Sequence, residues 1–332
     1  MFCTEKHQSP SWLIYALGGG MGHFTRALAL ARRAAQTGTP CVLLTNSALA
    51  AEVNTAALIP QGVSIVAIDP RADRDAVALR VAQEVSKQTW ACVLVDTFPR
   101  GLAGELPPIL SGMSNPCIWI HRFLCDAYAG RPEVLKAAQS FDHIIVPGET
   151  APLENLSNAT RTAPWLLLDS DELWAPAQAR SALDIPDDSV PSVVIVGCGT
   201  APEIQEAETL ASTMGKACGK QAHIRFVVPS KTWPLLRLLP GVNLLVGQAG
   251  YNTVQEARAT GTTLIARPRT RLYDRQHGRM SDTEHCFGSD AEGVSLVQSL
   301  LQGSQASQPC HYENGVHQAL RVIRAVIATS AP

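Results

Sequence analysis

The chain of 332 residues is longer than one hydrophobic core usually supports, so we expect two domains of roughly 150 residues each. With 46% hydrophobic and 17% charged residues and a formal net charge of −2, the composition gives no overall field that attracts nucleic acid. No charged and apolar leader opens the chain, and no apolar run approaches the ~18 residues of a membrane-spanning helix. We therefore expect a cytoplasmic protein without a transmembrane segment, and leave peripheral contact with the inner membrane face open.

Short apolar runs typical of strands alternate with amphipathic runs typical of helices, which favours parallel α/β sheets. In the first half we expect strands at 12–17, 41–45, 63–68, 91–96, 117–120 and 143–146, and helices at about 23–36 and 73–87. In the second half we expect strands at 192–197, 224–229, 242–247 and 262–266, and helices at about 203–217, 253–260, 291–301 and 315–328.

The stretch from 147 to 190 is rich in proline and poor in periodic apolar residues, which is typical of a connection between domains. We predict an α/β protein with two tandem Rossmann-like domains, residues 1–160 and 191–332, joined by a linker over 161–190. The last helix is free to pack back on the first domain.

The first glycine-rich loop follows the first expected strand, in "LGGGMGHFTRALALARR" at 17–33. Its glycines let a ligand approach the backbone, and the amides of the following helix attract negative charge. Gly19, Gly20, Gly22 and Arg26 are therefore candidates for binding an acceptor or a phosphate. His23 stands where a dinucleotide-binding G-x-G-x-x-G motif requires its third glycine, and no G-x-x-x-x-G-K-[ST] motif occurs. A nicotinamide enzyme and a P-loop nucleotidase are both disfavoured.

A second glycine loop, "VGQAGYNTVQEARATG" at 246–261, again leads from a strand into a helix. We expect that helix to begin near Asn252 or Thr253, either of which suits an N-cap and can also meet a phosphate. Glu256 lies one turn further, where its carboxylate can clamp two vicinal hydroxyls or bond the Thr253 backbone as a capping box. A third glycine turn places Gly199 and Thr200 after the first strand of the second half; it is either a ligand loop or a tight turn.

The segments "GGGMGH" and "GYNTVQEARATG…DRQ" together resemble the GT-B glycosyltransferases, in particular the MurG family, which transfers N-acetylglucosamine. The family's amino-terminal signature aligns with Gly18, Gly19, Gly20, Gly22 and His23, with Met21 in place of a glycine. Its donor motif is similar to residues 249–261 and to a following D-R-Q segment. The resemblance implies an active-site cleft between two Rossmann-like domains and a UDP-sugar as co-substrate, with no cofactor.

Residue by residue, the resemblance implies that Glu256 bonds the nucleotide ribose and that Asn252 and Thr253 lie beside the diphosphate. Gln276 of the D-R-Q segment would contact sugar hydroxyls. The other donor-binding candidates are Gly199, Thr200, Gly250 and Asp274. The family's second glutamine is replaced by His277, which leaves the identity of the donor sugar open. An arginine that the family places at the diphosphate has no direct counterpart, and Arg267, Arg269 and Arg271 are the candidates to replace it, or they form a solvated basic loop.

The chemistry needs a base for the acceptor hydroxyl, and His23 is the candidate because an imidazole takes up a proton near neutral pH. Asp96 ends the strand at 91–96; it orients His23, binds an acceptor hydroxyl or only caps the turn after it. The resemblance implies inversion at the anomeric carbon. We expect no metal, and we interpret the D-x-D pattern of Asp169, Ser170 and Asp171 as accidental.

The sequence thus favours a metal-independent, nucleotide-sugar-dependent glycosyltransferase that transfers a hexosyl or N-acetylhexosaminyl group. A UDP-sugar hydrolase is the first alternative, because such enzymes share a similar "GHxxR" opening, matched here by His23 and Arg26. A non-catalytic nucleotide-sugar binding protein is the second. The acceptor is not specified by the sequence, and a lipid-linked acceptor is one of the options.

Overall fold

The computed structural model describes residues 11–48, 50, 58–186, 189–281, 284–302 and 311–330. The chain divides into two compact units. The first unit contains residues 1–165 together with 315–332, and the second contains residues 166–314. The expected linker is shared between the two units, and its residues 187 and 188 lie outside the described part of the chain.

The first unit is built on a seven-stranded sheet in the order β3-β2-β1-β4-β5-β6-β7, in which every neighbouring pair is parallel. Its strands are β1 (Trp12–Ala16), β2 (Cys41–Thr45), β3 (Val63–Ala67), β4 (Cys92–Asp96), β5 (Cys117–Ile120), β6 (His143–Pro147) and β7 (Ala159–Thr162). The central strands β1, β4 and β5 are buried along their whole length, as expected when helices cover both faces of a parallel sheet.

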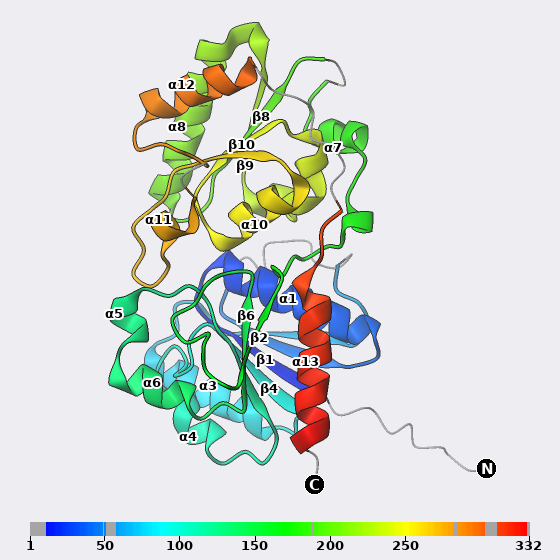
Figure 1. Ribbon diagram of the computed structural model, residues 1–332, viewed down its shortest axis with the longest axis vertical. Helices are drawn as coiled ribbons and strands as arrows, with labels where there is room; N and C mark the ends of the chain where they lie inside the picture. The colour runs from blue at the N-terminus through cyan, green and yellow to red at the C-terminus, as the bar shows by residue number, and fades with distance from the viewer. Residues whose placement is uncertain are drawn as a thin grey trace, which may run out of the picture. The chain divides into compact units, whose positions relative to one another are not determined.

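The helices in the described part of this unit are α1 (Met21–Gln36), α3 (Arg74–Ser86), α4 (Leu106–Leu110), α5 (Asp126–Ala129), α6 (Pro132–Ala138) and α13 (Gly315–Ser330). The final helix α13 packs against α1 (Figure 1) and against the edge strand β7, although it is far from α1 in sequence. The close packing at its start leaves no room for a side chain on Gly315, since a Cβ there would lie 1.8 Å from the carbonyl oxygen of Ala163.

The second unit has a five-stranded parallel sheet in the order β12-β11-β10-β8-β9. Its strands are β8 (Ser192–Val196), β9 (His223–Val227), β10 (Leu244–Gly247), β11 (Thr263–Ala266) and β12 (His285–Cys286). Its helices are α7 (Pro176–Ala182), α8 (Ala201–Cys218), α9 (Pro229–Thr232), α10 (Tyr251–Thr260), α11 (Gln276–Arg279) and α12 (Asp290–Leu301), with 3₁₀ turns at Ser170–Glu172, Gly219–Gln221 and Leu235–Gly241.

The predicted α/β class with two Rossmann-like sheets is confirmed, and the expected strands and long helices occur within a few residues of their predicted bounds. Among the described residues, two strands and six short helices were missed, namely β7, β12, α4, α5, α6, α7, α9 and α11. Strand β7 and helix α7 lie in the stretch that the prolines suggested was irregular. Strand β7 is a four-residue edge strand with partly exposed polar side chains, so it shows no apolar run.

The strand order of each sheet changes direction at one point, between β1 and β4 in the first unit and between β8 and β10 in the second. Connections leave such a point toward opposite sides, and ligands of open α/β sheets bind at the carboxyl ends of the strands there. All three glycine loops singled out in the sequence follow strands at these two points, namely β1, β8 and β10.

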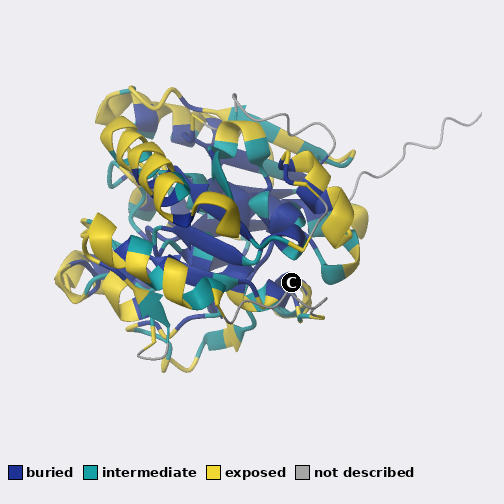
Figure 2. Ribbon diagram, turned by 90° about the horizontal axis from the view of Figure 1, so that it is seen from above, coloured by how far each residue is buried: buried dark blue, intermediate teal, exposed yellow. Residues whose placement is uncertain are grey.

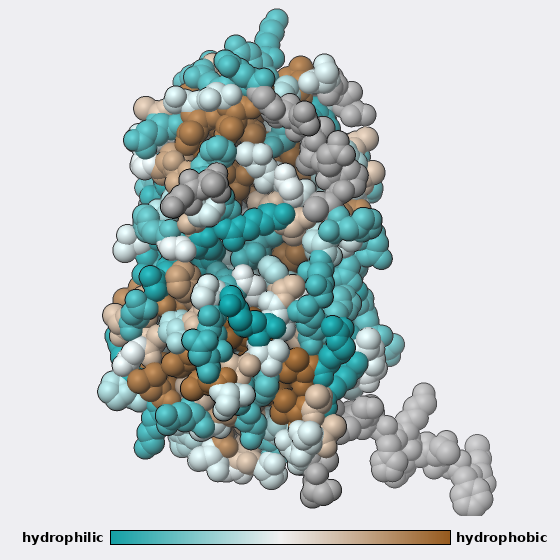
Figure 3. Space-filling view, viewed as in Figure 1, coloured by the Kyte–Doolittle hydropathy of each residue, from teal (hydrophilic) through white to brown (hydrophobic). Residues whose placement is uncertain are grey.

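The sheets form the buried layers of the units, while the helices carry exposed residues on their outer sides (Figure 2). On the face shown in Figure 3, hydrophobic residues occur in groups separated by hydrophilic ones. Among the described residues, no helix combines the length and the apolar character that crossing a membrane requires.

Candidate functional site

The first glycine loop is held by Asn46, which follows strand β2. Its side-chain oxygen accepts hydrogen bonds from the amides of Gly18 and Gly19, both at 2.9 Å. Gly19 has a φ of +72°, a conformation that a glycine adopts without strain. Two of the loop amides are therefore engaged by the protein itself. The amides open to a ligand are those of the first turn of α1, whose N-cap Gly20 has no side-chain capping bond.

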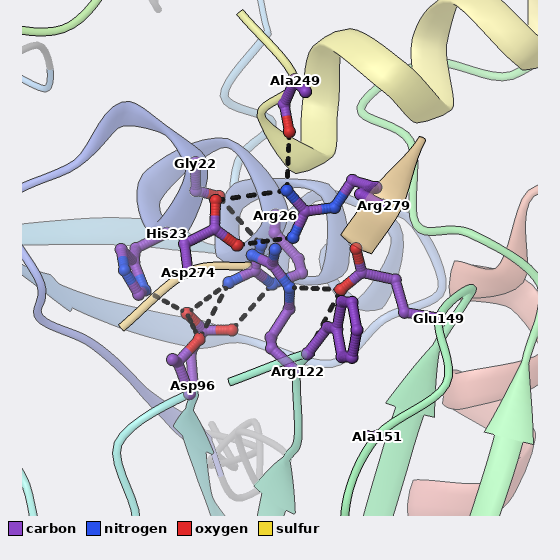
Figure 4. Close-up of polar contacts among 12 residues, drawn as sticks. Gly22, His23, Arg26, Asp96, Arg122, Glu149, Ala151, Ala249, Asp274 and Arg279 are labelled. Carbon is purple, nitrogen blue, oxygen red and sulfur yellow. Dashed lines mark hydrogen bonds and ion pairs between the residues drawn. The ribbon is translucent and has the colours of Figure 1, made fainter. Parts of the chain in front are cut away.

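His23 and Asp96 are brought together at the switch point of the first sheet, as Figure 4 shows. The Nδ1 atom of His23, in the first turn of α1, lies 2.6 Å from Oδ2 of Asp96, the last residue of β4. The carboxylate is completely buried, whereas 16% of the imidazole is exposed. Because Nδ1 is the nitrogen that meets the carboxylate, Nε2 is the nitrogen left for a ligand.

Arg26 lies beneath the loop, one turn after Gly22, and contacts both carboxylate oxygens of Asp96. Its Nε donates to Oδ1 at 2.8 Å and one terminal nitrogen donates to Oδ2 at 2.7 Å. A second terminal nitrogen donates to the carbonyl oxygen of Gly22 at 3.3 Å. The Arg26 side chain is completely buried, so its guanidinium is engaged with Asp96 and the helix rather than exposed on the loop.

The ionisation of Asp96 follows from these neighbours. Burial by itself raises the pKa of a carboxyl group, but the charge of Arg26 and the hydrogen bonds from His23 and Arg26 outweigh it. The pKa of Asp96 consequently lies well below its usual range, and the group is a carboxylate at neutral pH. A carboxylate bonded to Nδ1 holds the neutral imidazole as the Nδ1–H tautomer, which places the basic lone pair on Nε2.

The imidazole of His23 is also held in place by close contacts with Phe98 and Gly18. It stacks on Phe98, with the ring centroids 5.6 Å apart and the planes 28° from parallel. On Gly18, a Cβ would lie 2.5 Å from Nε2, so the absence of a side chain there gives the ring its place. The sequence marked Gly18 only as part of a motif and gave no signal for Phe98 or Asn46.

The loop after β10 begins α10 one to two residues earlier than the sequence predicted. The N-cap is Gly250, with extended backbone angles and no side-chain capping bond, so the expected N-cap role of Asn252 or Thr253 is wrong. The physical reason is that a glycine already supplies the extended N-cap conformation two residues before Asn252. Asn252 and Thr253 instead lie in the first turn, where amides lack acceptors within the helix.

Glu256 lies in the second turn of α10 and is buried, with 6% of the residue exposed. Within the described part of the chain, nothing donates a hydrogen bond to its side chain, and the suggested capping bond to the Thr253 backbone is not formed. Burial raises its pKa from 4.5 to about 8. The carboxyl group is therefore available to accept hydrogen bonds from a ligand.

The D-R-Q segment after β11 is tied to the glycine loop by Arg279, a residue that the sequence did not single out. Arg279 contacts the two carboxylate oxygens of Asp274 at 2.5 and 3.2 Å and donates to the carbonyl oxygen of Ala249 at 2.7 Å (Figure 4). Gln276 is buried, and its side-chain oxygen accepts from the amide of Arg269 at 2.9 Å. Its amide nitrogen therefore remains the group that can donate to a ligand, while His277 is exposed.

The turn after β8 engages its own side chains. Thr200 is the N-cap of α8, and its amide and hydroxyl both bond the carboxylate of Glu203, at 2.7 and 3.0 Å, in a capping box. Gly199 has a φ of +98°, and a Cβ on it would collide with that carboxylate. Of the two alternatives for this segment, a ligand loop or a tight turn, the structure shows the tight turn. Its capping box distinguishes α8 from α1 and α10, whose N-caps have no side-chain capping bond.

The three arginines that follow β11 all meet carboxylates. Arg271 pairs with Glu203 at 2.7 Å, Arg269 pairs with Glu206, and Arg267 pairs with Asp290. Arg271 also donates to the side chain of Gln248, next to the glycine loop, at 2.8 Å. The basic loop is therefore organised by ion pairs, with Arg271 the member that reaches the glycine loop directly.

The D-x-D pattern lies in a 3₁₀ turn of the second unit. Asp169, Asp171 and Glu172 offer oxygen atoms within 4.8 Å of one another. Asp169 and Glu172 form a capping box with the turn, and Asp169 also accepts from Asn314 at 2.8 Å. These contacts give the carboxylates of Asp169 and Glu172 a structural role in closing the turn.

The sequence matches no protein-family model and no curated protein. The fold is nevertheless similar to solved glycosyltransferases over almost the whole chain. A kitacinnamycin glycotransferase aligns with a TM-score of 0.59 and 12% identity, covering 97% of this chain and 96% of its own. MurG of Acinetobacter baumannii aligns with a TM-score of 0.59 and 13% identity, covering 95% and 100%. UGT89C1 of Arabidopsis thaliana, solved with UDP-L-rhamnose, aligns with a TM-score of 0.58 and 12% identity, covering 97% and 99%.

Proposed function

We infer a glycosyltransferase from the predicted GT-B architecture, which these alignments confirm because the chain shares the fold of glycosyltransferases that include MurG. We propose that this protein is a glycosyltransferase that moves a hexosyl or N-acetylhexosaminyl group from a UDP-sugar to an acceptor hydroxyl, with inversion and without a metal. The observation that carries the proposal is the 2.6 Å contact between His23 Nδ1 and the buried carboxylate of Asp96. In our proposal this contact makes His23 the base, at the point where the strand order of the first sheet changes direction.

In this proposal His23 Nε2 takes the proton of the acceptor hydroxyl. The acceptor oxygen then bonds the anomeric carbon, while the bond from that carbon to the diphosphate oxygen breaks and UDP leaves. Asp96 keeps the imidazole in the Nδ1–H tautomer and stabilises the imidazolium that forms. A positioned base of this kind contributes typically ~10²- to 10⁴-fold to a rate.

The donor side of the proposal is supported by two features of α10. The uncapped first-turn amides at Asn252 and Thr253 offer donors to the leaving diphosphate, together with the helix dipole. The unpaired carboxyl of Glu256 offers an acceptor for ribose hydroxyls. UDP is favoured as the nucleotide because UGT89C1, which has the same fold, was solved with UDP-L-rhamnose.

The sugar site of the proposal uses Gln276, whose amide nitrogen is available as a donor, and Asp274, which Arg279 holds in place. His277 replaces the second glutamine of the MurG pattern. We therefore propose that the donor carries either a hexosyl or an N-acetylhexosaminyl group. The acceptor is proposed only as a molecule with a nucleophilic hydroxyl, and a lipid-linked acceptor is included.

The test is a panel of nucleotide sugars incubated with the protein, with and without a cell extract that supplies acceptors. Transfer predicts UDP release that needs the extract. UDP release without extract, accompanied by free sugar, would replace the proposal with the hydrolase. UDP binding without release under either condition would leave only a binding protein.

The rate of turnover with the best donor of the panel then tests the role of His23 as the base. His23→Ala should leave UDP affinity within about twofold and lower turnover by ~10²-fold or more. The matched control is His317→Ala, which removes an exposed histidine from α13 and should leave both quantities unchanged. A folded His23→Ala protein with normal turnover would remove His23 from the mechanism.

A further inference from the structure

Thr97, directly after the β4 carboxylate, occupies a backbone conformation that threonine rarely adopts. Its φ is +68°, and the amide of Phe98 donates to the carbonyl oxygen of Asp96 at 2.8 Å, which closes a three-residue turn around it. Positive φ is costly for a β-branched residue, and the γ-turn with positive φ is rare and strained. Among the described residues, the other non-glycine with positive φ is Asp184.

The side chain of Thr97 contacts the Asp96 carboxylate that His23 also meets. Its hydroxyl donates to Oδ2 of Asp96 at 3.1 Å and accepts from a terminal nitrogen of Arg26 at 3.1 Å. Oδ2 of Asp96 consequently meets three partners, His23, Arg26 and Thr97. A glycine would relieve the backbone but would remove this hydroxyl.

The main chain of Thr97 is held from the neighbouring strand. Its carbonyl oxygen accepts from the indole nitrogen of Trp119 at 3.1 Å, and its amide donates to the carbonyl oxygen of Ile120 at 2.9 Å. Trp119 is completely buried in β5, so the indole is a fixed point in the core. The strained turn is therefore held by hydrogen bonds to β5.

We propose that Thr97 is a positioning residue: its strained turn, clamped by Trp119, places a hydroxyl on Asp96 so that the carboxylate keeps its aim on His23 Nδ1. This inference rests on the proposed role of His23 as the base. Strain that persists at one residue is explained when the conformation delivers a group that an unstrained residue cannot deliver. Here the delivered group is the hydroxyl, which shares Asp96 with Arg26 and His23.

Three substitutions separate the hydroxyl from the turn. Thr97→Val keeps the shape and removes the hydroxyl, Thr97→Ser keeps the hydroxyl, and Thr97→Gly removes both the hydroxyl and the strain. The first readout is the proton resonance of His23 Nδ1–H, assigned by its loss in His23→Ala and measured without any substrate. It should stay in place in Thr97→Ser and move in Thr97→Val and Thr97→Gly.

The second readout is kinetic. Thr97→Val should lower kcat about tenfold with the KM of the donor unchanged, since the loss of a hydrogen bond to a charged group has an effect of about this size. The kcat of Thr97→Ser should stay within about twofold of the wild type. Thr97→Gly should lower kcat as Thr97→Val does, although its melting temperature rises by a few degrees. Asp184→Gly is the control, because it relieves a positive φ on the other unit and should raise the melting temperature without changing kcat or the resonance.

An unmoved His23 resonance in folded Thr97→Val overturns the proposal and leaves Thr97 as a turn residue. A Thr97→Gly protein with wild-type kcat overturns it as well. If the wild-type protein turns over no nucleotide sugar, the proposed function fails, and the resonance still decides whether Thr97 positions the pair.

Discussion

The α-carbon of Gly18 faces the imidazole of His23 so closely that a Cβ on Gly18 would lie 2.5 Å from Nε2 and 2.6 Å from Cδ2. The ring cannot withdraw freely, because Nδ1 is bonded to Asp96 and one face stacks on Phe98. Gly18 has no positive φ, so its requirement for glycine comes from the space that the imidazole occupies and not from its backbone conformation.

Gly18→Ala is therefore expected to act through His23. The added methyl group should push the imidazole off Asp96 and lower turnover by ~10²-fold, the usual effect of a lost general base, with UDP affinity within about twofold. Initial rates and calorimetry on the same preparation measure both. Gly215→Ala is the control, because a Cβ at that position in α8 meets nothing within 4 Å. Normal turnover in Gly18→Ala would mean that the ring position is not needed.

Asp96→Asn should destabilise the protein as well as slow it. The variant leaves the Arg26 guanidinium buried without its charge partner, and breaking such a pair costs about 3–5 kcal/mol. Because the pKa of Asp96 is lowered in the folded state, its contribution is present above the unfolded value of 3.8 and is lost as the pH falls below it. Urea unfolding should therefore show a large difference between variant and wild type at pH 7 that shrinks on acidification.

The exposed Asp75 at the start of α3 provides the comparison for Asp96. Asp75→Asn should change the free energy of unfolding by no more than ~0.5 kcal/mol at either pH. Equal destabilisation by the two variants would show that the ion pair with Arg26 contributes little.

Glu256 should make stability fall as the pH rises. Its pKa is about 8 when folded and 4.5 when unfolded, so the folded state holds an extra proton between these values. The free energy of unfolding should decrease across that window by a few kcal/mol, and above pH 8 the Glu256 contribution should be constant. Glu256→Gln should abolish this slope, as measured by urea unfolding at several pH values. An unchanged slope in Glu256→Gln would place the titration elsewhere.

The same carboxyl group predicts a proton released on UDP binding. At pH 7 free Glu256 is mostly protonated, while ribose hydroxyls donate to the ionised form. Calorimetry in two buffers of different ionisation enthalpy should detect the release of close to one proton, which Glu256→Gln should eliminate together with ~10-fold of affinity. UDP binding by the wild type without proton release would contradict the ribose role.

Arg279→Lys should weaken donor binding although the charge is kept. A lysine lacks the planar fork that reaches Asp274 and the Ala249 carbonyl together, so the D-R-Q segment and the glycine loop lose their tie. We expect the KM of the donor to rise ~10-fold with a smaller change in kcat. Arg80→Lys, on an arginine of α3 that is half exposed, should change neither. A donor KM unaffected by Arg279→Lys would show that the two segments hold their places independently.

The sequence by itself determined the fold class and most elements, because buried parallel strands and amphipathic helices leave strong apolar patterns. It also marked His23, Asp96 and Glu256, since strand ends and glycine loops reveal where an open sheet presents its ligand edge. It missed elements that are too short to carry such a pattern, namely the strands β7 and β12 and the helices α4, α5, α6, α7, α9 and α11.

Only the tertiary structure decided which of the marked residues contact one another. Residues 23 and 96 are 73 positions apart, and their hydrogen bond exists because β1 and β4 are neighbours in the sheet. Arg26 proved to be the buried counter-ion of Asp96 instead of a loop residue. Asn46, Thr97 and Arg279 were noticed only from contacts between segments distant in sequence or from an unusual backbone angle. Periodicity reports which face of an element is buried, but pairing, tautomer and strain depend on which elements become neighbours.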